Sequence, residues 1–206
     1  LNFLVKGKSS PIFIEKSIKN FQKAIDIEDT DYFTFSQLGF IHLFFKEFLD
    51  IEKAREFLNK AILFGEADIN FNSASLGNHS SSFEFNYNPS TITSNSLMYL
   101  GQIYYREQNF EKAYELAKKG YQINPNNLRV GFDLAKYSIC TNRIESGATL
   151  LEEIIEQDRH ISIKAILDED LAKNKFVRDY LNHKSKLTYE MAYDNFQKIK
   201  QEIRPD

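Results

Sequence analysis

The sequence predicts an all-α fold built from stacked helical hairpins. Apolar residues recur at spacings of three and four, as one face of an α-helix requires. The clearest example is the stretch 97–125, LMYLGQIYYREQNFEKAYELAKKGYQINP, in which two such periods are separated by a turn at Gln108-Asn109. Similar offsets of small and apolar residues occur before and after this stretch. We therefore use it to set the register of the other helices.

Small residues mark where the two helices of this stretch are expected to meet. Gly101 lies within the apolar face of the first helix, where an isolated glycine costs about 1 kcal/mol relative to alanine. We therefore expect a second helix to approach Gly101 closely. That helix presents Ala113 and Ala117. It ends at Asn124-Pro125, because proline cannot continue a helix.

The stretch resembles a tetratricopeptide repeat, a helix–turn–helix unit of about 34 residues with set residue types at fixed offsets. Leu97, Ala117 and Gly120 replace the usual Trp, Phe and Ala. The matching positions, in chain order, are Leu97, Leu100, Gly101, Tyr104, Ala113, Ala117, Gly120 and Pro125. The resemblance implies a right-handed α-α superhelix of helical hairpins, and a role in protein–protein binding.

On this register the chain divides into a repeat array, 1–158, and a C-terminal helical capping region, 159–206. A final amphipathic helix at 188–203 is expected to cover the apolar end of the array, as terminal elements of repeat proteins do. Within the array we predict, in order, a half repeat at 11–29, a repeat at 32–66, a long insertion at 67–95, a repeat at 96–127 and a repeat at 128–158.

The predicted insertion is much longer than the usual connection between repeats. It is rich in Asn and Ser and carries aromatic residues at Phe71, Phe83, Phe85 and Tyr87. Loops longer than about 12–15 residues in compact domains are usually functional or disordered. Two interpretations stay open. The segment is a mobile surface excursion, or it is a lid that lies extended in the concave groove of the array.

Composition excludes several classes of protein. Hydrophobic residues make up 42% and charged residues 27% of the chain, which is typical of a globular protein. The net charge of −3 argues against nucleic acid as a ligand, because phosphate binding needs a basic face. Apolar runs are too short to cross a membrane. With Cys140 as its only cysteine, the chain is expected in the cytoplasm. The start at Leu1 suggests a fragment or a processed product.

Residues that carry chemistry are sparse and scattered. The histidines lack the spacing of metal ligands, and we expect no metal and no cofactor. Asp168-Glu169-Asp170 is a compact acidic run, to which we assign helix capping and a favourable interaction with the helix dipole. Cys140 is expected to be a buried small residue rather than a nucleophile. We therefore expect that the chain is not an enzyme.

The resemblance also implies which residues face the concave groove. One end of this surface is aromatic and the other is basic, which would suit a peptide with apolar anchors and some acidic character. Ser36 and Phe40 stand where repeats of the chaperone-tail type carry Lys and Asn, so that carboxylate clamp is not supported. The predicted partner-binding residues are Phe33, Phe40, Phe44, Met98, Gln102, Tyr105, Arg106, Arg129, Phe132 and Lys136.

Two functions remain open at this point. The first is a non-catalytic scaffold that binds a peptide or protein partner in the groove. The second is a regulatory or sensor segment of a larger protein whose enzymatic or nucleotide-binding domain lies elsewhere. Association with a second copy of the chain is also left open, and the sequence does not identify the partner.

Overall fold

The computed structural model describes residues 11–74 and 88–203 of the 206-residue chain. Every regular element in these two ranges is helical, which confirms the prediction of an all-α fold. A short 3-10 turn, η1, covers Lys46–Phe48. The α-helices are α1 (Pro11–Ile27), α2 (Tyr32–Phe44), α3 (Ile51–Ala74), α4 (Pro89–Arg106), α5 (Phe110–Ile123), α6 (Leu128–Cys140), α7 (Ile144–Gln157), α8 (His160–Leu167), α9 (Glu169–Lys173) and α10 (Lys175–Ile203).

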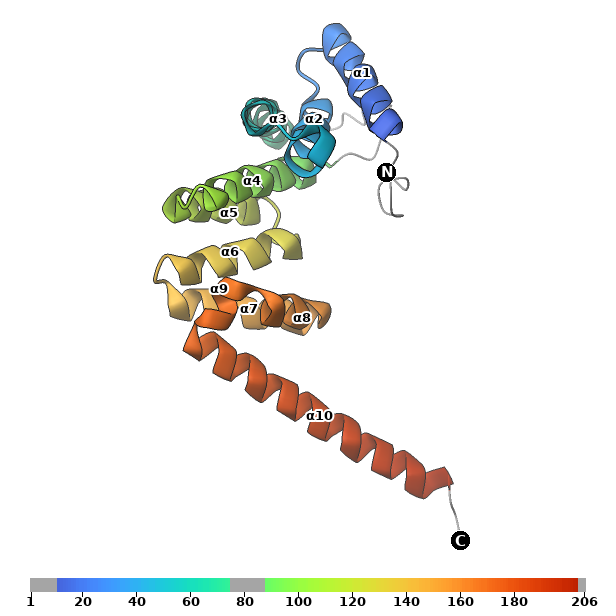
Figure 1. Cartoon of the computed structure of the whole chain (residues 1–206), viewed down its shortest axis with the longest axis vertical. Helices are drawn as coiled ribbons and strands as arrows, with labels where there is room; N and C mark the ends of the chain where they lie inside the picture. The colour runs from blue at the N-terminus through green and yellow to red at the C-terminus, as the bar shows by residue number, and fades with distance from the viewer. Residues whose placement is uncertain (1–10, 75–87, 204–206) are drawn as a thin grey trace.

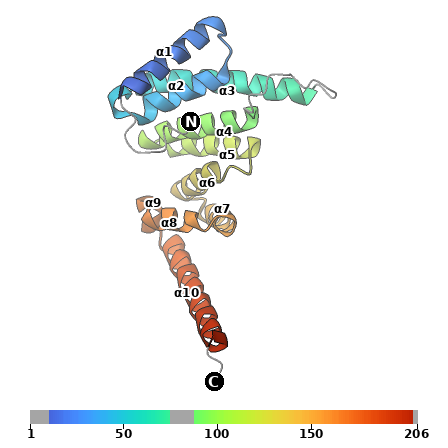
Figure 2. The same ribbon diagram turned by 90° about the vertical axis from the view of Figure 1, so that its right-hand side faces the viewer.

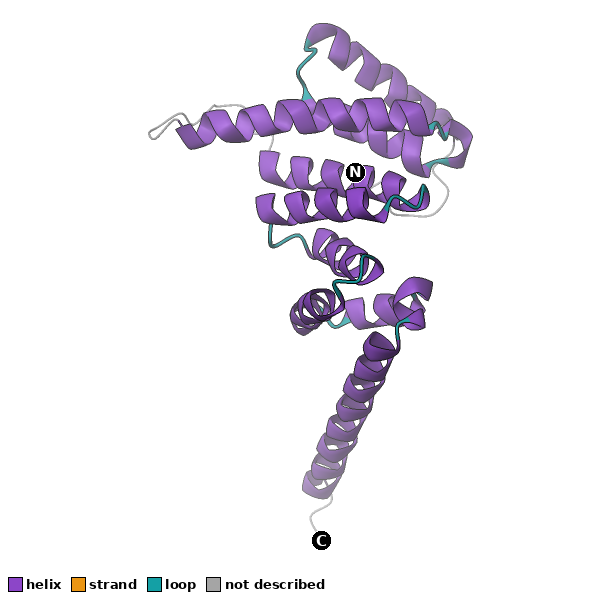
Figure 3. Cartoon of the chain, turned by 90° about the vertical axis from the view of Figure 1, so that its left-hand side faces the viewer, coloured by secondary structure: helices purple, strands orange, loops and turns teal. Residues whose placement is uncertain are grey.

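Successive helices pair into hairpins, and the hairpins stack on one another (Figure 1). The pairs are α2 with α3, α4 with α5, and α6 with α7. Helix α3 also packs on α4, and α5 packs on α6, so each hairpin continues into the next. Helix α3 extends beyond its neighbours on one side of the stack (Figures 2 and 3). This arrangement is a tetratricopeptide-like helical array, as predicted, while the handedness of its superhelix stays a prediction.

The turns of the α4–α5 and α6–α7 hairpins have the same geometry. Gln108 and Asn142 lie 34 residues apart and adopt left-handed φ angles of 62° and 63°. In each turn the next residue donates its backbone N–H to a carbonyl five positions earlier, at 2.9 Å and 2.8 Å. These bonds satisfy carbonyls that would otherwise be left free at the end of a helix. The two hairpins are therefore copies of one structural unit.

The second helix of the hairpin approaches Gly101, as expected, and an even closer helix contact occurs at Gly147. A Cβ atom on Gly101 would lie 3.4 Å from the carbonyl oxygen of Ala113, which is an ordinary contact. A Cβ atom on Gly147 would lie 2.7 Å from both the carbonyl oxygen of Ala135 and Cγ1 of Ile139. Helix α5 therefore does approach Gly101, as expected, although an alanine would also fit there. Among the glycines that the structure describes, the closest approach of a neighbouring backbone is at Gly147, between α6 and α7.

Helices extend into both ends of the range predicted as an insertion, 67–95. Helix α3 continues to Ala74, and α4 begins at Pro89. The start of α4 has a clear local cause, because the Asn88 side chain accepts from the backbone N–H of Ser90 at 2.9 Å and proline suits the first helical turn. The predicted bounds are therefore wrong. Residues 75–87, with three of the aromatic residues and the question of a lid, lie outside the described residues.

The C-terminal cap is formed by other residues than predicted. Helix α10 is continuous from Lys175, and its far end points away from the array instead of covering it (Figure 1). The apolar end of the array is covered earlier, by α8, α9 and the first turns of α10. The buried residues that these helices add to the core of α6 and α7 are Ile161, Ala165, Leu171, Val177 and Leu181.

Replacing Gly147 with alanine should lower the free energy of unfolding by about 1–3 kcal/mol, because the new methyl group overlaps a backbone carbonyl. Gly101→Ala should instead raise it by up to about 1 kcal/mol, since alanine favours the helix and its Cβ atom would make only ordinary contacts. Urea denaturation of the two variants measures the difference. Equal destabilisation by both would contradict the placement of the tight contact.

The cap makes a second prediction about stability. Leu171→Ala should cost about 2–5 kcal/mol, because Leu171 is fully buried in the core that joins α9 to α6 and α7. Leu167→Ala, a few residues earlier, removes a side chain that is 75% exposed and should change stability by less than about 0.5 kcal/mol. Thermal unfolding compares the two. A small effect of Leu171→Ala would show that α9 is not part of the core.

Candidate functional site

A hollow of about 550 Å³ lies on the face formed by the first helices of the hairpins. Helices α2, α4 and α6 each contribute side chains to it, and the segment that contains α8 lines its remaining side. The lining residues are Phe40, Phe44, Met98, Tyr99, Gln102, Leu128, Arg129, Phe132, Asp133, Asp158, His160, Ile161 and Lys164. The hollow therefore draws on three hairpins and on one helix outside them.

One end of the hollow is aromatic. The ring of Phe40 lies 4.9 Å from that of Phe44 and 5.4 Å from that of Tyr99, and Phe44 and Tyr99 are 5.5 Å apart between centroids. These separations are in the range of favourable aromatic pairs. Phe44 is 41% exposed, so part of the cluster is open to solvent. The guanidinium of Arg106 lies 5.8 Å from the centroid of the Phe44 ring.

The floor of the hollow is apolar apart from one polar pair. Met98 and Phe132 are almost fully buried. Between the hairpins, Nε2 of Gln102 donates to Oδ2 of Asp133 at 2.6 Å. Burial raises the pKa of the Asp133 carboxyl above its ordinary value of 3.8, because desolvation disfavours the charged form. The floor thus holds a carboxylate that is hydrogen-bonded but has lost much of its solvation.

The other end of the hollow is basic. Arg129 is exposed on α6, and Nζ of Lys164 on α8 lies 3.8 Å from the centroid of the Phe132 ring. Burial lowers the pKa of Lys164; the negative charges of Asp133 and Asp168 offset part of this effect, and the positive charge of Arg129 adds to it. Asp158 helps to cap the start of α8, since its carboxylate accepts a hydrogen bond from the backbone N–H of His160 at 2.9 Å. The groups here that are open to a ligand are therefore the cations.

The structure brings most of the predicted groove residues together. Arg106 lies beside the aromatic end through its contact with Phe44, while Phe33 is half-buried near the start of α2 and is not among the lining residues. Whether any of these residues contacts a partner stays a prediction. Six of the ten predicted residues line the hollow: Phe40, Phe44, Met98, Gln102, Arg129 and Phe132.

Tyr105 and Lys136 have partners within the chain instead. The ammonium of Lys136 lies 2.8 Å from Oδ2 of Asp168, and both side chains are largely buried. The hydroxyl of Tyr105 donates to Asp170, and this hydrogen bond lowers the pKa of the Asp170 carboxyl. The physical reason is that the start of α9 lies against the concave face of α4 and α6. We therefore leave these two residues out of the proposed binding surface.

The acidic run at the start of α9 has the capping role that the sequence indicated. Oδ1 of Asp168 accepts from the backbone N–H groups of Asp170 and Leu171, at 3.1 Å and 3.2 Å. Its other carboxylate oxygen binds Lys136, which the sequence did not indicate. One residue thus caps α9 and fastens it to α6.

Lys164, His160, Tyr99 and Asp133 line the hollow but were not predicted. Tyr99 and Asp133 lie on the first helices of their hairpins, next to predicted positions, so a wider choice of concave positions would have included them. Lys164 and His160 lie on α8, outside the repeat register. The repeat pattern carries no signal for them.

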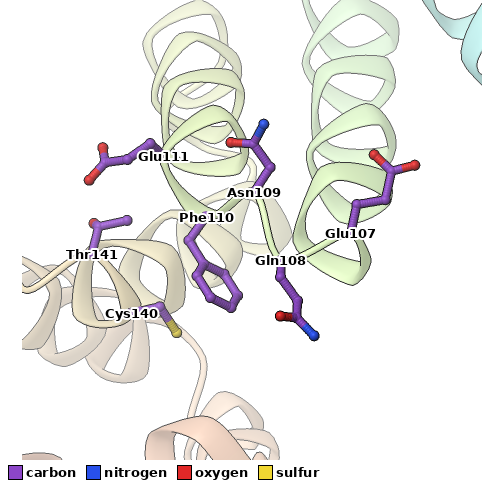
Figure 4. A pocket seen from close by; sticks show the side chains of 7 residues that line it. All are labelled: Glu107, Gln108, Asn109, Phe110, Glu111, Cys140 and Thr141. Atoms are coloured by element: carbon purple, nitrogen blue, oxygen red, sulfur yellow. The ribbon is translucent and has the colours of Figure 1, made fainter.

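A second hollow, of about 430 Å³, lies beside the α4–α5 turn (Figure 4). Figure 4 shows the ring of Phe110 between the Cys140 sulfur and the Gln108 amide, while Glu107 points away. Burial raises the pKa of the Cys140 thiol, which keeps it protonated at neutral pH and makes it a poor nucleophile. No histidine lines this hollow. Its residues therefore do not form an activated-cysteine arrangement.

Comparison with known proteins agrees with this geometry. Residues 94–127 match the family model described as tetratricopeptide repeat. The matched range covers most of α4, all of α5 and the turn to α6. No curated protein sequence matches the chain. The α4–α5 hairpin is thus a tetratricopeptide repeat, set in a longer tetratricopeptide-like array.

In the described parts of the chain, no three His, Cys, Asp or Glu side chains gather as metal ligands would. Over the same residues, no helix is both long and apolar enough to cross a membrane.

Replacing Asp133 with asparagine should raise the free energy of unfolding at pH 7. The pKa of Asp133 is raised in the folded state, so its ionised form weakens the fold as pH rises through that pKa. Asparagine keeps an acceptor for Gln102 and carries no charge. The gain should vanish below about pH 3.8, where aspartate is protonated in both states.

Urea denaturation from pH 3 to pH 8 measures this effect. Asp29→Asn, at an exposed position between α1 and α2, is the matched control and should change stability by less than about 0.5 kcal/mol. If Asp133→Asn destabilised the protein at pH 7, the nearby cations would be compensating the buried charge, and the expected sign would be wrong.

Proposed function

We propose that this chain is a non-catalytic interaction module that binds a peptide or protein partner in the hollow between α2, α4, α6 and α8. The observation that carries the proposal is the open aromatic cluster of Phe40, Phe44 and Tyr99 at the end of that hollow. The tetratricopeptide repeat supports it, because such repeats generally mediate protein–protein interaction.

The size and lining of the hollow suit one or two side chains of a partner. Its volume of about 550 Å³ is within the usual range of binding pockets. A buried aromatic side chain removes roughly 150–250 Å² from water and often dominates the energy of an interface. Met98 and Phe132 supply an apolar floor for such an anchor, and the Gln102–Asp133 pair supplies polar groups that orient it.

Selection of random dodecapeptides displayed on phage against the whole chain should yield peptides that bind this hollow. Phe44→Ala should weaken the binding of the selected peptides by roughly 5- to 30-fold, as loss of an interface anchor does. Phe13→Ala is the matched control, because Phe13 is an exposed phenylalanine on α1, outside the hollow. It should leave binding unchanged.

Fluorescence anisotropy with labelled copies of the selected peptides measures the affinities. Thermal unfolding of both variants checks that Phe44→Ala still folds. Two outcomes would contradict the proposal: selection that enriches no peptide, or equal loss of binding in the Phe44 and Phe13 variants.

A further inference from the structure

Exposed cations lie in and beside the hollow. Arg106, Arg129 and Lys164, which we call the rim cations, are exposed. None of the three forms an ion pair with a described residue, in contrast to Lys136 on the same face. The chain as a whole carries a net charge of −3, so this basic rim is a local feature and does not reflect the overall composition.

The two carboxylates of the hollow are less accessible to a ligand than Arg129 and Lys164. Asp133 is only 6% exposed and accepts a hydrogen bond from Gln102. Asp158 accepts from the backbone at the start of α8. Both are therefore occupied by donors of the chain itself. An incoming ligand would meet Arg129 and Lys164 before it met either carboxylate.

A contact within the chain pairs a neighbouring cation of this face with acidic residues. Lys136 lies two turns after Arg129 on α6, and it is held by Asp168 and Asp170 from α9. Asp170 also accepts a hydrogen bond from the Tyr105 hydroxyl, and the Lys136 ammonium lies 4.3 Å from the centroid of the Tyr105 ring. The chain thus covers one part of its concave face with an acidic segment, and leaves the adjoining cations uncovered.

Resting on the proposed function, we infer that the partner is an acidic peptide. An aromatic or large apolar side chain of the peptide lies against Phe40, Phe44 and Tyr99, and a nearby carboxylate lies between Arg129 and Lys164. Lys164 sits in partly desolvated surroundings against the Phe132 ring, where a carboxylate partner is worth more than at an open surface. A basic peptide is disfavoured, because it would have to pass the rim cations.

Asp133 provides a second test of the ligand's charge, because its own charge is opposite to that of Lys164. Its charge lies in the floor of the same hollow and acts on Lys164 through space. The negative charge repels a bound carboxylate, so removing it strengthens the binding of an acidic ligand and weakens that of a basic one. Lys164 and Asp133 therefore give opposite responses, and the direction of each response reports the charge of the ligand.

Three matched sets of labelled synthetic peptides test the inference with the whole chain. Each peptide has one Phe and one Glu, Gln or Lys, separated by one to six serines. In fluorescence anisotropy the best Glu peptide should bind about fivefold or more tightly than its Gln counterpart at low salt, and the Lys peptide should be the weakest. This preference should shrink as salt is added.

Two variants then assign the preference to the hollow. Lys164→Gln should abolish most of the preference for Glu over Gln, and Asp133→Asn should increase it. Lys118→Gln is the matched control, because Lys118 also lies over an aromatic ring, that of Tyr114 at 5.9 Å, but on α5. It should leave the preference unchanged. Thermal unfolding shows that each variant is folded.

The outcomes separate this inference from the proposed function. Tighter binding of the Lys peptides, or an unchanged preference in Lys164→Gln, would overturn the acidic ligand. If the peptides bound without any charge preference and Phe44→Ala abolished that binding, the acidic ligand would also be overturned, while the proposed function would stand. Failure of every peptide to bind, including those from the phage selection, would overturn both.

Discussion

The whole array depends on how closely successive helices can approach. Fully buried alanines at Ala113 and Ala117 bring α5 against its neighbours, and at Gly147 the backbone of α6 leaves no room for even a methyl group. Turns of the same geometry 34 residues apart then join the helices of two successive hairpins. Their first helices then present one continuous face, and the hollow is a consequence of that spacing.

Much of the array could be predicted from the sequence, because helical period and small residues are local signals. The predicted turn and C-terminal end of the α4–α5 hairpin agree with the structure within a few residues. The early start of α4 does not follow from the repeat register; the local helix-start signal Asn88-Pro89 accounts for it. A glycine such as Gly101 indicates that a helix can approach, and the packing of that helix decides whether alanine would also fit.

The candidate site was predictable only in part, for a different reason. Positions such as Phe40, Gln102 and Phe132 follow from the repeat, because their direction is fixed by the helix that carries them. The partners of Lys136 and Tyr105 depend on how residues 159–174 fold back, which no periodic pattern encodes. Lys164 also lies in the hollow because residues 159–174 fold back onto the array. Contacts between the array and its non-repetitive cap need the three-dimensional structure.

Helix α8 separates two requirements, packing in the core and lining the hollow, that are usually met by the same repeat. Only Ile161 and Ala165 anchor it in the core, while its other apolar residues, Ile163, Ile166 and Leu167, are exposed beside Lys164. Substitutions on its outer side can therefore accumulate without disturbing the packing of the hairpins. Such a helix is a place where recognition can diversify between related proteins, or be redesigned, while the scaffold that carries it stays the same.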